Sequence, residues 1–233
     1  MKIHIIRHGE PDYSIDSLTE KGWREAHLLA ERIAALPIDD YYCSPLGRAR
    51  DTAKPTVEKT GKPIEVLDWL REFAGRIESP FTGEKRLCWD LPPYLWANEE
   101  QFYDVNNWTK PALMASGNVE EIYAETVKGI DALLLRYGWE RHGRLYCGGE
   151  EKTIALFCHF AMGITIFSYL LGVSPVVAQN NFFMAPSSVT TLCTETDRKG
   201  CSHFRAMEIG DTSHLYIAGE PVSLSGFYPE FEL

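Results

Sequence analysis

The residues best suited to chemistry stand at the first apolar run of the sequence. Residues 2–6 are mostly apolar and β-branched, and Gly9 bounds them, which predicts a buried strand that ends at Arg7 and His8. In open α/β sheets, ligands bind at the carboxyl edge of the strands. A histidine there can act as a nucleophile, an arginine beside it can clamp an anion, and a following glycine lets backbone approach a ligand. A solvated Arg-His pair at a strand end is the alternative interpretation.

A second histidine stands in an equivalent place. Residues 152–158 form a near-continuous apolar run, typical of a central parallel strand, and His159 follows it directly. Residues 160–171 continue as an apolar helix that ends at Gly172. A lone histidine among apolar residues is more often a satisfied core group than a catalyst, but two histidines in equivalent positions favour one shared site.

An arginine follows the next predicted strand. Residues 39–43 are the strand, and the following residues open a helix with Ser44 as N-cap and Pro45 at its first position. Arg48 then falls near the first turn, where a helix N-terminus favours an anion and a guanidinium adds bidentate contacts. Taken alone, Arg48 could equally be an exposed helical arginine.

These segments, in this order, resemble the histidine phosphatase superfamily, also called the phosphoglycerate mutase-like family. The matching features are Arg7-His8-Gly9, the Ser-x-Leu-x-Arg-Ala-x-x-Thr-Ala segment at 44–53, and the closing Asp-Thr-Ser-His at 211–214. The resemblance implies that His8 attacks phosphorus, while Arg7, Arg48 and a protonated His159 hold the phosphoryl oxygens. It also implies that His214 is structural or adjacent to the substrate.

The resemblance nominates a general acid as well. In the superfamily an acid in a Leu-x-Glu context soon after the third strand protonates the leaving group, and Leu-Arg-Glu at 70–72 points to Glu72. Burial or neighbouring negative charge can raise a glutamate's pKa enough for this role. Asp68, Glu65 and Glu78 are competing candidates.

The chain departs from the family pattern beside His159. The family usually has His-Gly there, whereas here the next residue is Phe160. Its side chain could narrow the pocket, although its backbone N–H stays available to a phosphate oxygen. This departure, together with Pro11, leaves open a non-catalytic phosphate-binding module of the same fold.

The order of the segments predicts a single domain with a three-layer α/β/α fold and a mixed, mainly parallel sheet. Residues 76–119 form an aromatic- and proline-rich insertion, which predicts an irregular cap with short helices and its own small aromatic core. The resemblance implies that this cap covers the site. Residues 138–149 are expected to be a turn-rich connector, and residues 187–195 an outer strand paired antiparallel with 204–209.

Composition excludes several classes of partner. The formal net charge of −10 argues against a nucleic-acid or anionic-membrane binder. The six cysteines show neither a C-x-x-C pair nor metal-ligand spacing, so reduced thiols are expected. There is no signal-peptide pattern and no apolar run near the ~20 residues of a membrane span. We therefore expect a soluble cytoplasmic protein.

The predicted function is hydrolysis of a small-molecule phosphomonoester through a phosphohistidine, without a metal or other cofactor. A phosphoglycerate mutase-type phosphotransferase would use the same residues but needs a basic cap. In residues 76–119 acidic residues outnumber basic ones, which favours the phosphatase. The oligomeric state is open.

Overall fold

The computed structural model describes residues 1–227, and an eight-stranded sheet runs through it in the order β5-β4-β10-β1-β11-β12-β9-β8. The strands are β1 Lys2–Arg7, β4 Asp40–Cys43, β5 Ile64–Val66, β8 Trp139–His142, β9 Leu145–Gly148, β10 Thr153–Cys158, β11 Val189–Thr196 and β12 Cys201–Asp211. The four strands from β5 to β1 pair in parallel, and the remaining four add antiparallel.

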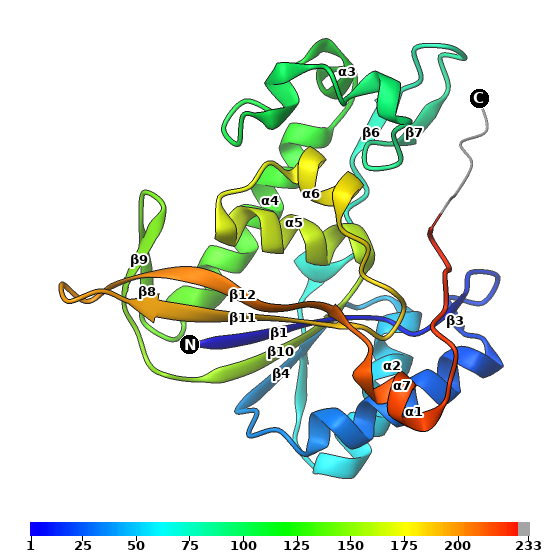
Figure 1. The fold of residues 1–233 in the computed structure, drawn as a ribbon, viewed down its shortest axis with the longest axis vertical. Coiled ribbons are helices and arrows are strands. Elements are labelled where there is room, and N and C mark those ends of the chain that lie inside the picture. The colour runs from blue at the N-terminus through cyan, green and yellow to red at the C-terminus, as the bar shows by residue number, and fades with distance from the viewer. Residues whose placement is uncertain (228–233) are drawn as a thin grey trace.

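Helices cover both faces of this sheet (Figure 1). On one face lie α1 Glu20–Ala34, α2 Gly47–Thr60 and α7 Ser213–Ala218; on the other lie α4 Val119–Leu135, α5 Phe160–Leu171 and α6 Pro175–Asn181. The smaller elements are β2 Pro11–Asp12, β3 Ser17–Leu18, β6 Arg76–Glu78, β7 Lys85–Leu87, α3 Ala112–Ala115 and the 3-10 helices η1 Asp68–Leu70, η2 Pro93–Leu95 and η3 Glu100–Tyr103. The predicted three-layer α/β/α fold with a parallel sheet core is confirmed.

The pairing of β1 with β10 brings the two histidines together. Both strands are apolar on both faces because helices cover them on each side. Their parallel register places Arg7 opposite Cys158, and the N–H of His8 donates to the carbonyl of Cys158 at 3.0 Å. His8 and His159 therefore directly follow adjacent strands and lie at the same edge of the sheet.

The helix α1 packs tightly under the loop that follows His8. Thr19 caps this helix by accepting from the N–H of Gly22 at 3.0 Å. A Cβ at Gly22 would lie only 2.2 Å from the carbonyl oxygen of Glu10. The glycine thus allows the close approach of α1 to the residues beside His8.

The helix α2 begins two residues later than expected. Its first residue is Gly47, and the Gly47 N–H donates to Oδ2 of Asp16 at 2.7 Å. The N-cap is Leu46 rather than Ser44, whose hydroxyl accepts from the N–H of Leu46 and also bonds His159. A distant aspartate thus replaces the local cap and releases Ser44 for the site.

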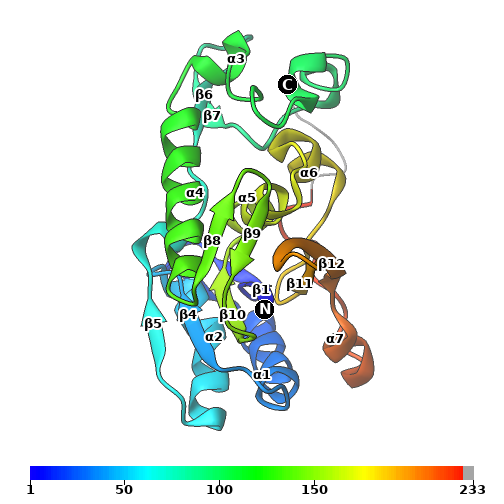
Figure 2. The ribbon, with the colours of Figure 1, turned by 90° about the vertical axis from the view of Figure 1, so that its left-hand side faces the viewer.

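The antiparallel half of the sheet differs from expectation in three ways. Residues expected to form only a turn-rich connector include the hairpin β8–β9, which extends the sheet (Figure 2). The strand β11 lies between β1 and β12, so it is internal rather than outer. Cys147 and Cys201 are opposite one another on β9 and β12 and form a disulfide, so the expectation of six reduced thiols is wrong for this pair. Strand pairing brings together cysteines that are 54 residues apart in sequence.

The aromatic residues of 76–119 pack into the main core. Trp96, Phe102 and Trp108 are buried in the same cluster as Leu133 of α4 and Ile5 of β1. The expectation that the segment builds a separate small core is therefore wrong. Its short elements are held against α4 and α5, above the sheet in Figure 1.

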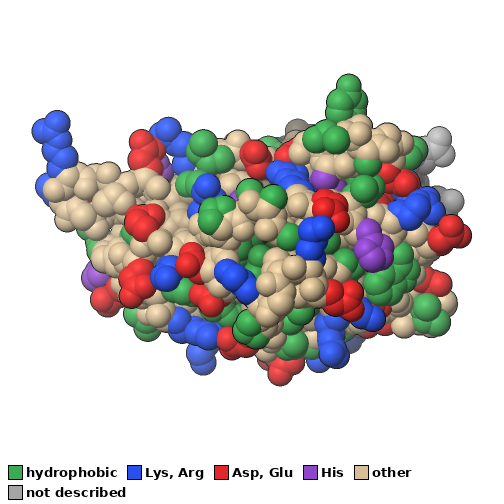
Figure 3. Space-filling view, turned by 90° about the horizontal axis from the view of Figure 1, so that it is seen from below, with side chains coloured by type: hydrophobic (Ala, Val, Ile, Leu, Met, Phe, Trp, Pro, Cys, Tyr) green, Lys and Arg blue, Asp and Glu red, His purple; other side chains and the backbone are tan. Residues whose placement is uncertain are grey.

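The surface carries both charges in close mixture. On the face in Figure 3, acidic and basic side chains are interspersed with hydrophobic ones. Pairs such as Lys59–Glu31, at 2.7 Å, tie α2 to α1, and Arg24–Glu220, at 3.0 Å, ties α1 to the C-terminal segment. Among residues 1–227, none of the helices combines the length and the apolar character needed to span a membrane.

Candidate active site

His8 is held in a single tautomer. Its Nδ1 lies 2.7 Å from the carbonyl oxygen of Gly9, and because a carbonyl can only accept, Nδ1 carries the proton. Nε2 is therefore the nitrogen with the lone pair, and Nε of Arg48 donates to it at 3.3 Å. Burial, reinforced by the charge of Arg7, lowers the pKa of His8 well below its ordinary value. The ring is thus neutral and can act as a nucleophile.

His159 lies beside His8, with 5.2 Å between the ring centroids. Its Nε2 is 2.7 Å from Oγ of Ser44, which itself accepts from the N–H of Leu46 at 3.2 Å. The serine hydroxyl can donate its hydrogen to His159 Nε2, and in that arrangement the ring proton stands on Nδ1. Nδ1 is buried and has no hydrogen-bond partner among the described residues.

The ring of His159 does not need a second proton to donate. Burial, followed by the field of His8 and the charge of Arg48, lowers the pKa of His159 well below its ordinary value. The electrostatics of the substrate-free structure therefore favour a neutral ring, in contrast to the protonated one expected from sequence. A neutral ring with the proton on Nδ1 still offers one N–H to an incoming oxygen, and a bound phosphate dianion would raise this pKa.

Arg48 is oriented by an aspartate from another segment. Its Nη1 donates to Oδ1 of Asp16 at 2.5 Å, while Oδ2 of the same carboxylate accepts from the N–H of Gly47. Asp16 has φ of +49°, a left-handed conformation that aspartate tolerates better than most residues. One turn further along α2, Oγ1 of Thr52 accepts from the N–H of Gly9 at 2.9 Å. The helix thus presents Arg48 and Thr52 to the histidine loop.

Arg7 is buried and joins three distant segments. Its Nη1 donates to the carbonyl of Met184 at 2.7 Å, and its Nη2 donates to the carbonyl of Ser225 at 2.8 Å. The guanidinium carbon lies 5.5 Å from the ring centroid of Phe160. The C-terminal segment therefore packs directly on the arginine that precedes His8.

Glu72 is the candidate acid whose pKa is raised. Its Oε1 accepts from the N–H of Phe73 at 2.8 Å and of Met162, in the first turn of α5, at 2.9 Å. Burial raises its pKa, and this outweighs the opposing effects of the two N–H donors and of Arg7 and Arg48. Glu72 also borders a cavity of about 140 Å³, a path by which its proton can exchange with solvent.

The three competing acids lie in other environments. Glu65 pairs with Arg136 at 2.7 Å on the surface, the Asp68 side chain is 90% exposed, and Glu78 is exposed in β6. None of these three side chains is buried as Glu72 is, so Glu72 fits the acid role better than these three.

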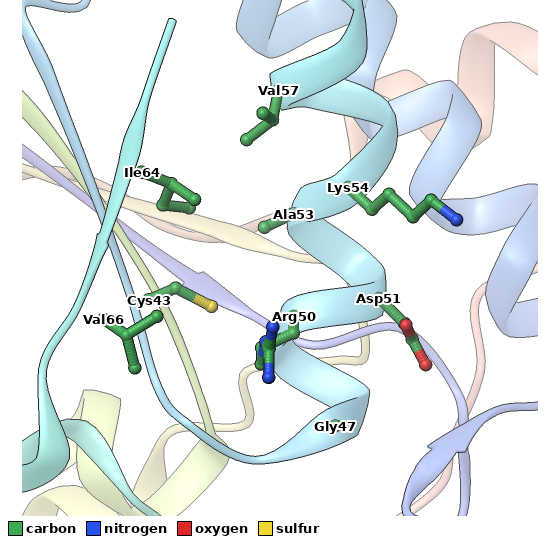
Figure 4. Close-up of a pocket in the computed structure, with 9 residues that line it drawn as sticks. All are labelled: Cys43, Gly47, Arg50, Asp51, Ala53, Lys54, Val57, Ile64 and Val66. Atoms are coloured by element: carbon green, nitrogen blue, oxygen red, sulfur yellow. The ribbon is translucent and has the colours of Figure 1, made fainter.

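A cavity of about 420 Å³ lies on the other side of α2 (Figure 4). Arg50 and Ala53 line it from the helix, and Ile64 lines it from β5. Arg48 and Thr52 do not line it, because they face the histidine loop. This hollow is therefore separate from the histidine pair.

Metal-ligating side chains do not cluster here. Over residues 1–227, no three His, Cys, Asp or Glu side chains gather closely enough to hold a metal ion. The cations around the histidines are supplied by Arg7 and Arg48.

A family model described as the histidine phosphatase superfamily (branch 1) matches residues 3–206. The chain belongs to the histidine phosphatase superfamily. The family resemblance predicted from the sequence is thus confirmed, and with it phosphatase activity on phosphomonoesters through a phosphohistidine.

Individual relatives agree with this assignment. A probable phosphatase of Schizosaccharomyces pombe is 25% identical over 230 residues, covering 92% of this chain and 95% of the relative. A 2,3-bisphosphoglycerate-dependent phosphoglycerate mutase of Thermoplasma acidophilum is 37% identical over 99 residues, covering 36% of this chain and half of the mutase. The crystal structure of a phosphoserine phosphatase mutant from Entamoeba histolytica, in complex with phosphoserine, superposes with a TM-score of 0.60 at 24% identity, covering 92% of this chain and 98% of that one.

The structure of this histidine phosphatase also places residues that the sequence did not single out. Asp16 orients Arg48, and the carbonyl of Ser225 accepts from Arg7. His214 is buried 3.3 Å from Ser187, whose N–H donates to the carbonyl of His8, so it lies behind the site. These contacts link segments far apart in sequence, and no motif or spacing in the sequence indicates them.

Proposed function

We propose that this histidine phosphatase hydrolyses a small phosphomonoester with His8 as nucleophile and Glu72 as general acid. Nε2 of His8 attacks phosphorus, the bond from phosphorus to the ester oxygen breaks, and Glu72 gives its proton to that oxygen. The products of this step are a free alcohol and a phosphohistidine. Water then attacks phosphorus, the P–N bond breaks, and the Glu72 carboxylate takes the water's proton.

The observation that supports the nucleophile most directly is the hydrogen bond from His8 Nδ1 to the Gly9 carbonyl. It keeps the lone pair on Nε2 without any proton transfer before attack. Burial lowers the pKa of His8, so the ring stays neutral over the working pH range.

Three side chains are proposed to hold the transferred phosphoryl group. Arg7 and Arg48 supply positive charge, and Nδ1–H of His159 supplies a directed donor. Fixed donors of this kind stabilise the charge on the equatorial oxygens without reorganising during the reaction. A bound phosphate must then compete with the Asp16 carboxylate for the Arg48 guanidinium. The ion pair with Asp16 keeps that guanidinium in place between turnovers.

The experiment that tests this is hydrolysis of a panel of phosphomonoesters in chelator by wild type and His8→Ala, with acid-labile protein phosphorylation followed in parallel. We expect turnover and labelling in wild type and neither in the variant. Full activity of His8→Ala would disprove the proposed nucleophile.

Phosphoglycerate mutase activity is the alternative function, because part of the chain is similar to a phosphoglycerate mutase. A mutase would hold its phosphohistidine stably and depend on a bisphosphate primer. A non-catalytic module would bind phosphate without labelling or turnover. The three outcomes are distinct in the same assay.

We propose a small-molecule substrate rather than a nucleic acid, on the basis of the acidic net charge of −10. We also propose a cytoplasmic location, because Cys43, Cys88, Cys158 and Cys193 are free thiols. The disulfide between Cys147 and Cys201 points the other way, because such bonds are rare in a reducing cytosol. Thiol alkylation at lysis, followed by mass spectrometry, tests this: the cytoplasmic proposal expects both cysteines to be alkylated.

A further inference from the structure

Four aromatic side chains from four separate segments form a continuous row beside Arg7. The ring centroids of Trp89 and Phe160 are 5.8 Å apart, those of Phe160 and Phe183 are 6.4 Å apart, and those of Phe183 and Phe227 are 5.3 Å apart. Exposure rises from 9% at Phe160 to 51% at Phe227. We call these four residues the aromatic row; it leads from the buried site to the surface.

One end of the row is fixed next to the proposed acid. Nε1 of Trp89 donates to the carbonyl of Phe73 at 2.9 Å, and the N–H of Phe73 donates to Glu72. The indole is therefore one residue from the carboxyl that would protonate the leaving oxygen. Its only N–H is already used, so Trp89 presents apolar surface.

The middle of the row is fixed on the proposed phosphate-binding arginine. The guanidinium carbon of Arg7 lies 5.5 Å from the Phe160 centroid and 5.9 Å from the Phe183 centroid. Nη1 of Arg7 also donates to the carbonyl of Met184, the residue after Phe183. Phe160 itself follows His159 at the start of α5.

These anchors locate the alcohol part of a bound substrate. The phosphoryl group would lie on Arg7, and the ester oxygen must reach Glu72. The carbon skeleton attached to the ester oxygen then extends along the rings of the aromatic row that lie between Arg7 and Glu72. An aromatic ring placed there gains edge and face contacts with Trp89 and Phe183. A polyol would exchange its hydrogen bonds with water for apolar contacts and lose affinity.

We infer that Trp89, Phe160 and Phe183 form the leaving-group subsite, and that it selects phosphomonoesters whose alcohol carries a flat aromatic ring. This inference rests on the proposed function, because it takes the positions of the phosphoryl group and the acid from it. Phe160, which departs from the family's usual glycine, is then a specificity residue that fills space next to the phosphate.

The test compares three primary alkyl phosphates whose alcohols have similar leaving-group chemistry. They are 2-phenylethyl phosphate, 2-cyclohexylethyl phosphate, which has the same carbon skeleton with a puckered saturated ring, and glycerol 1-phosphate, a polyol. In wild type we expect kcat/KM for the phenyl ester to exceed that for the cyclohexyl ester by about three- to tenfold. We expect it to exceed that for glycerol phosphate by more than tenfold.

The variants are Phe183→Leu and Trp89→Leu, which keep apolar bulk but remove a ring. Both are expected to bring the phenyl-to-cyclohexyl ratio close to one, mainly through KM. Phe183→Tyr keeps the aromatic ring and should keep the phenyl-to-cyclohexyl ratio. A retained ratio in this variant shows that the change in Phe183→Leu comes from loss of the ring and not from misfolding. The matched control is Phe182→Leu, because Phe182 is the neighbouring residue but packs on Phe167, with 5.6 Å between centroids.

Two results would overturn the inference while leaving the proposed function intact. One is equal kcat/KM for the phenyl and cyclohexyl esters in wild type, and the other is an unchanged ratio in both leucine variants. Absence of turnover and of acid-labile labelling with all three esters would instead refute the proposed function, and the inference with it.

Discussion

Ser44 and His159 are joined by a buried hydrogen bond, with Oγ of the serine 2.7 Å from Nε2 of the histidine. The bond crosses from the end of β4 to the end of β10. Because the serine oxygen also accepts from the N–H of Leu46, its own hydrogen can be given to Nε2. The second histidine thereby keeps a proton on Nδ1, the atom proposed to face the phosphate.

This arrangement predicts a measurable cost for Ser44→Ala. Without the hydroxyl, His159 is no longer held in the Nδ1–H tautomer, and kcat/KM should fall about tenfold, corresponding to about 1.4 kcal/mol. Competitive inhibition by inorganic phosphate should weaken by a similar factor. The matched control is Ser188→Ala, since that buried hydroxyl has no partner among the described residues. Equal effects of the two substitutions would contradict the tautomer argument.

The proposed acid predicts a dependence on the leaving group. Glu72→Gln keeps the acceptor oxygen for Phe73 and Met162 but cannot give a proton. Hydrolysis of an alkyl phosphate should fall by about 10²- to 10⁴-fold. Hydrolysis of 4-nitrophenyl phosphate should fall far less at the first step, because nitrophenolate leaves without protonation. Pre-steady-state release of the alcohol or phenol measures this; equal losses for both esters would exclude Glu72 as the acid.

The raised pKa of Glu72 also predicts the alkaline limit of activity. The carboxyl must be protonated to act as the acid, and burial keeps it protonated at higher pH than an exposed glutamate. We expect the kcat/KM of alkyl phosphates to fall as pH rises through that pKa, and the profile for 4-nitrophenyl phosphate to lack this limb. An identical alkaline limb for both esters would assign it to another group.

Local patterns in the sequence were sufficient for the elements that carry the site. Strand β1 and helix α5 are signalled by continuous apolar runs, and the helix ends at Gly172 as expected, with φ of +67°. Arg7, His8 and His159 stand at the ends of apolar strands, so their place at the sheet edge follows from the fold class.

The contacts that orient those residues could not be obtained in the same way. Asp16 caps a helix 31 residues away, and Ser225 contacts an arginine 218 residues away. Neither the periodicity nor the residue spacing of the sequence indicates such contacts between distant residues. The hairpin β8–β9 was missed for a related reason, because its short strands are stabilised by pairing, of β9 with β12 and of β8 with β9, rather than by their own pattern. The disulfide was missed for the same reason, because the pairing of β9 with β12 places Cys147 opposite Cys201.

The disulfide predicts a loss of stability without a loss of activity. Cys147 and Cys201 close a loop with a sequence separation of 54, which in the chain-entropy model corresponds to about 4 kcal/mol. Cys201→Ser should lower the melting temperature by roughly 8–16 °C for a chain of this size. The bonded strands are separated from β1 by β11, so kcat/KM should stay within about twofold. Cys193→Ser, which alters a cysteine outside any disulfide, is the control. Equal melting temperatures for the two variants would show that the bond adds no stability.

The burial of Glu25 predicts that the free energy of unfolding decreases as the pH rises. Its side chain is fully buried beneath the histidine loop, where Oε2 accepts from the N–H of Glu10 at 2.8 Å and Oε1 has no partner among the described residues. Burial raises its pKa to about 7, against which the Glu10 N–H is a smaller opposing effect. The folded chain therefore keeps a proton that the unfolded chain has lost, and stability falls as pH rises from about 4.5 to 7, by up to about 3 kcal/mol.

Glu25→Gln isolates this contribution, because it keeps an acceptor for Glu10 and cannot ionise. Urea unfolding at pH 5 and pH 8 should show the wild type losing about 3 kcal/mol relative to the variant between the two values. The comparison is needed because burial lowers the pKa of His4 and His214 to about 4, which makes stability rise with pH over a lower window in both proteins. A parallel pH dependence for Glu25→Gln and wild type would mean that this carboxyl ionises without cost.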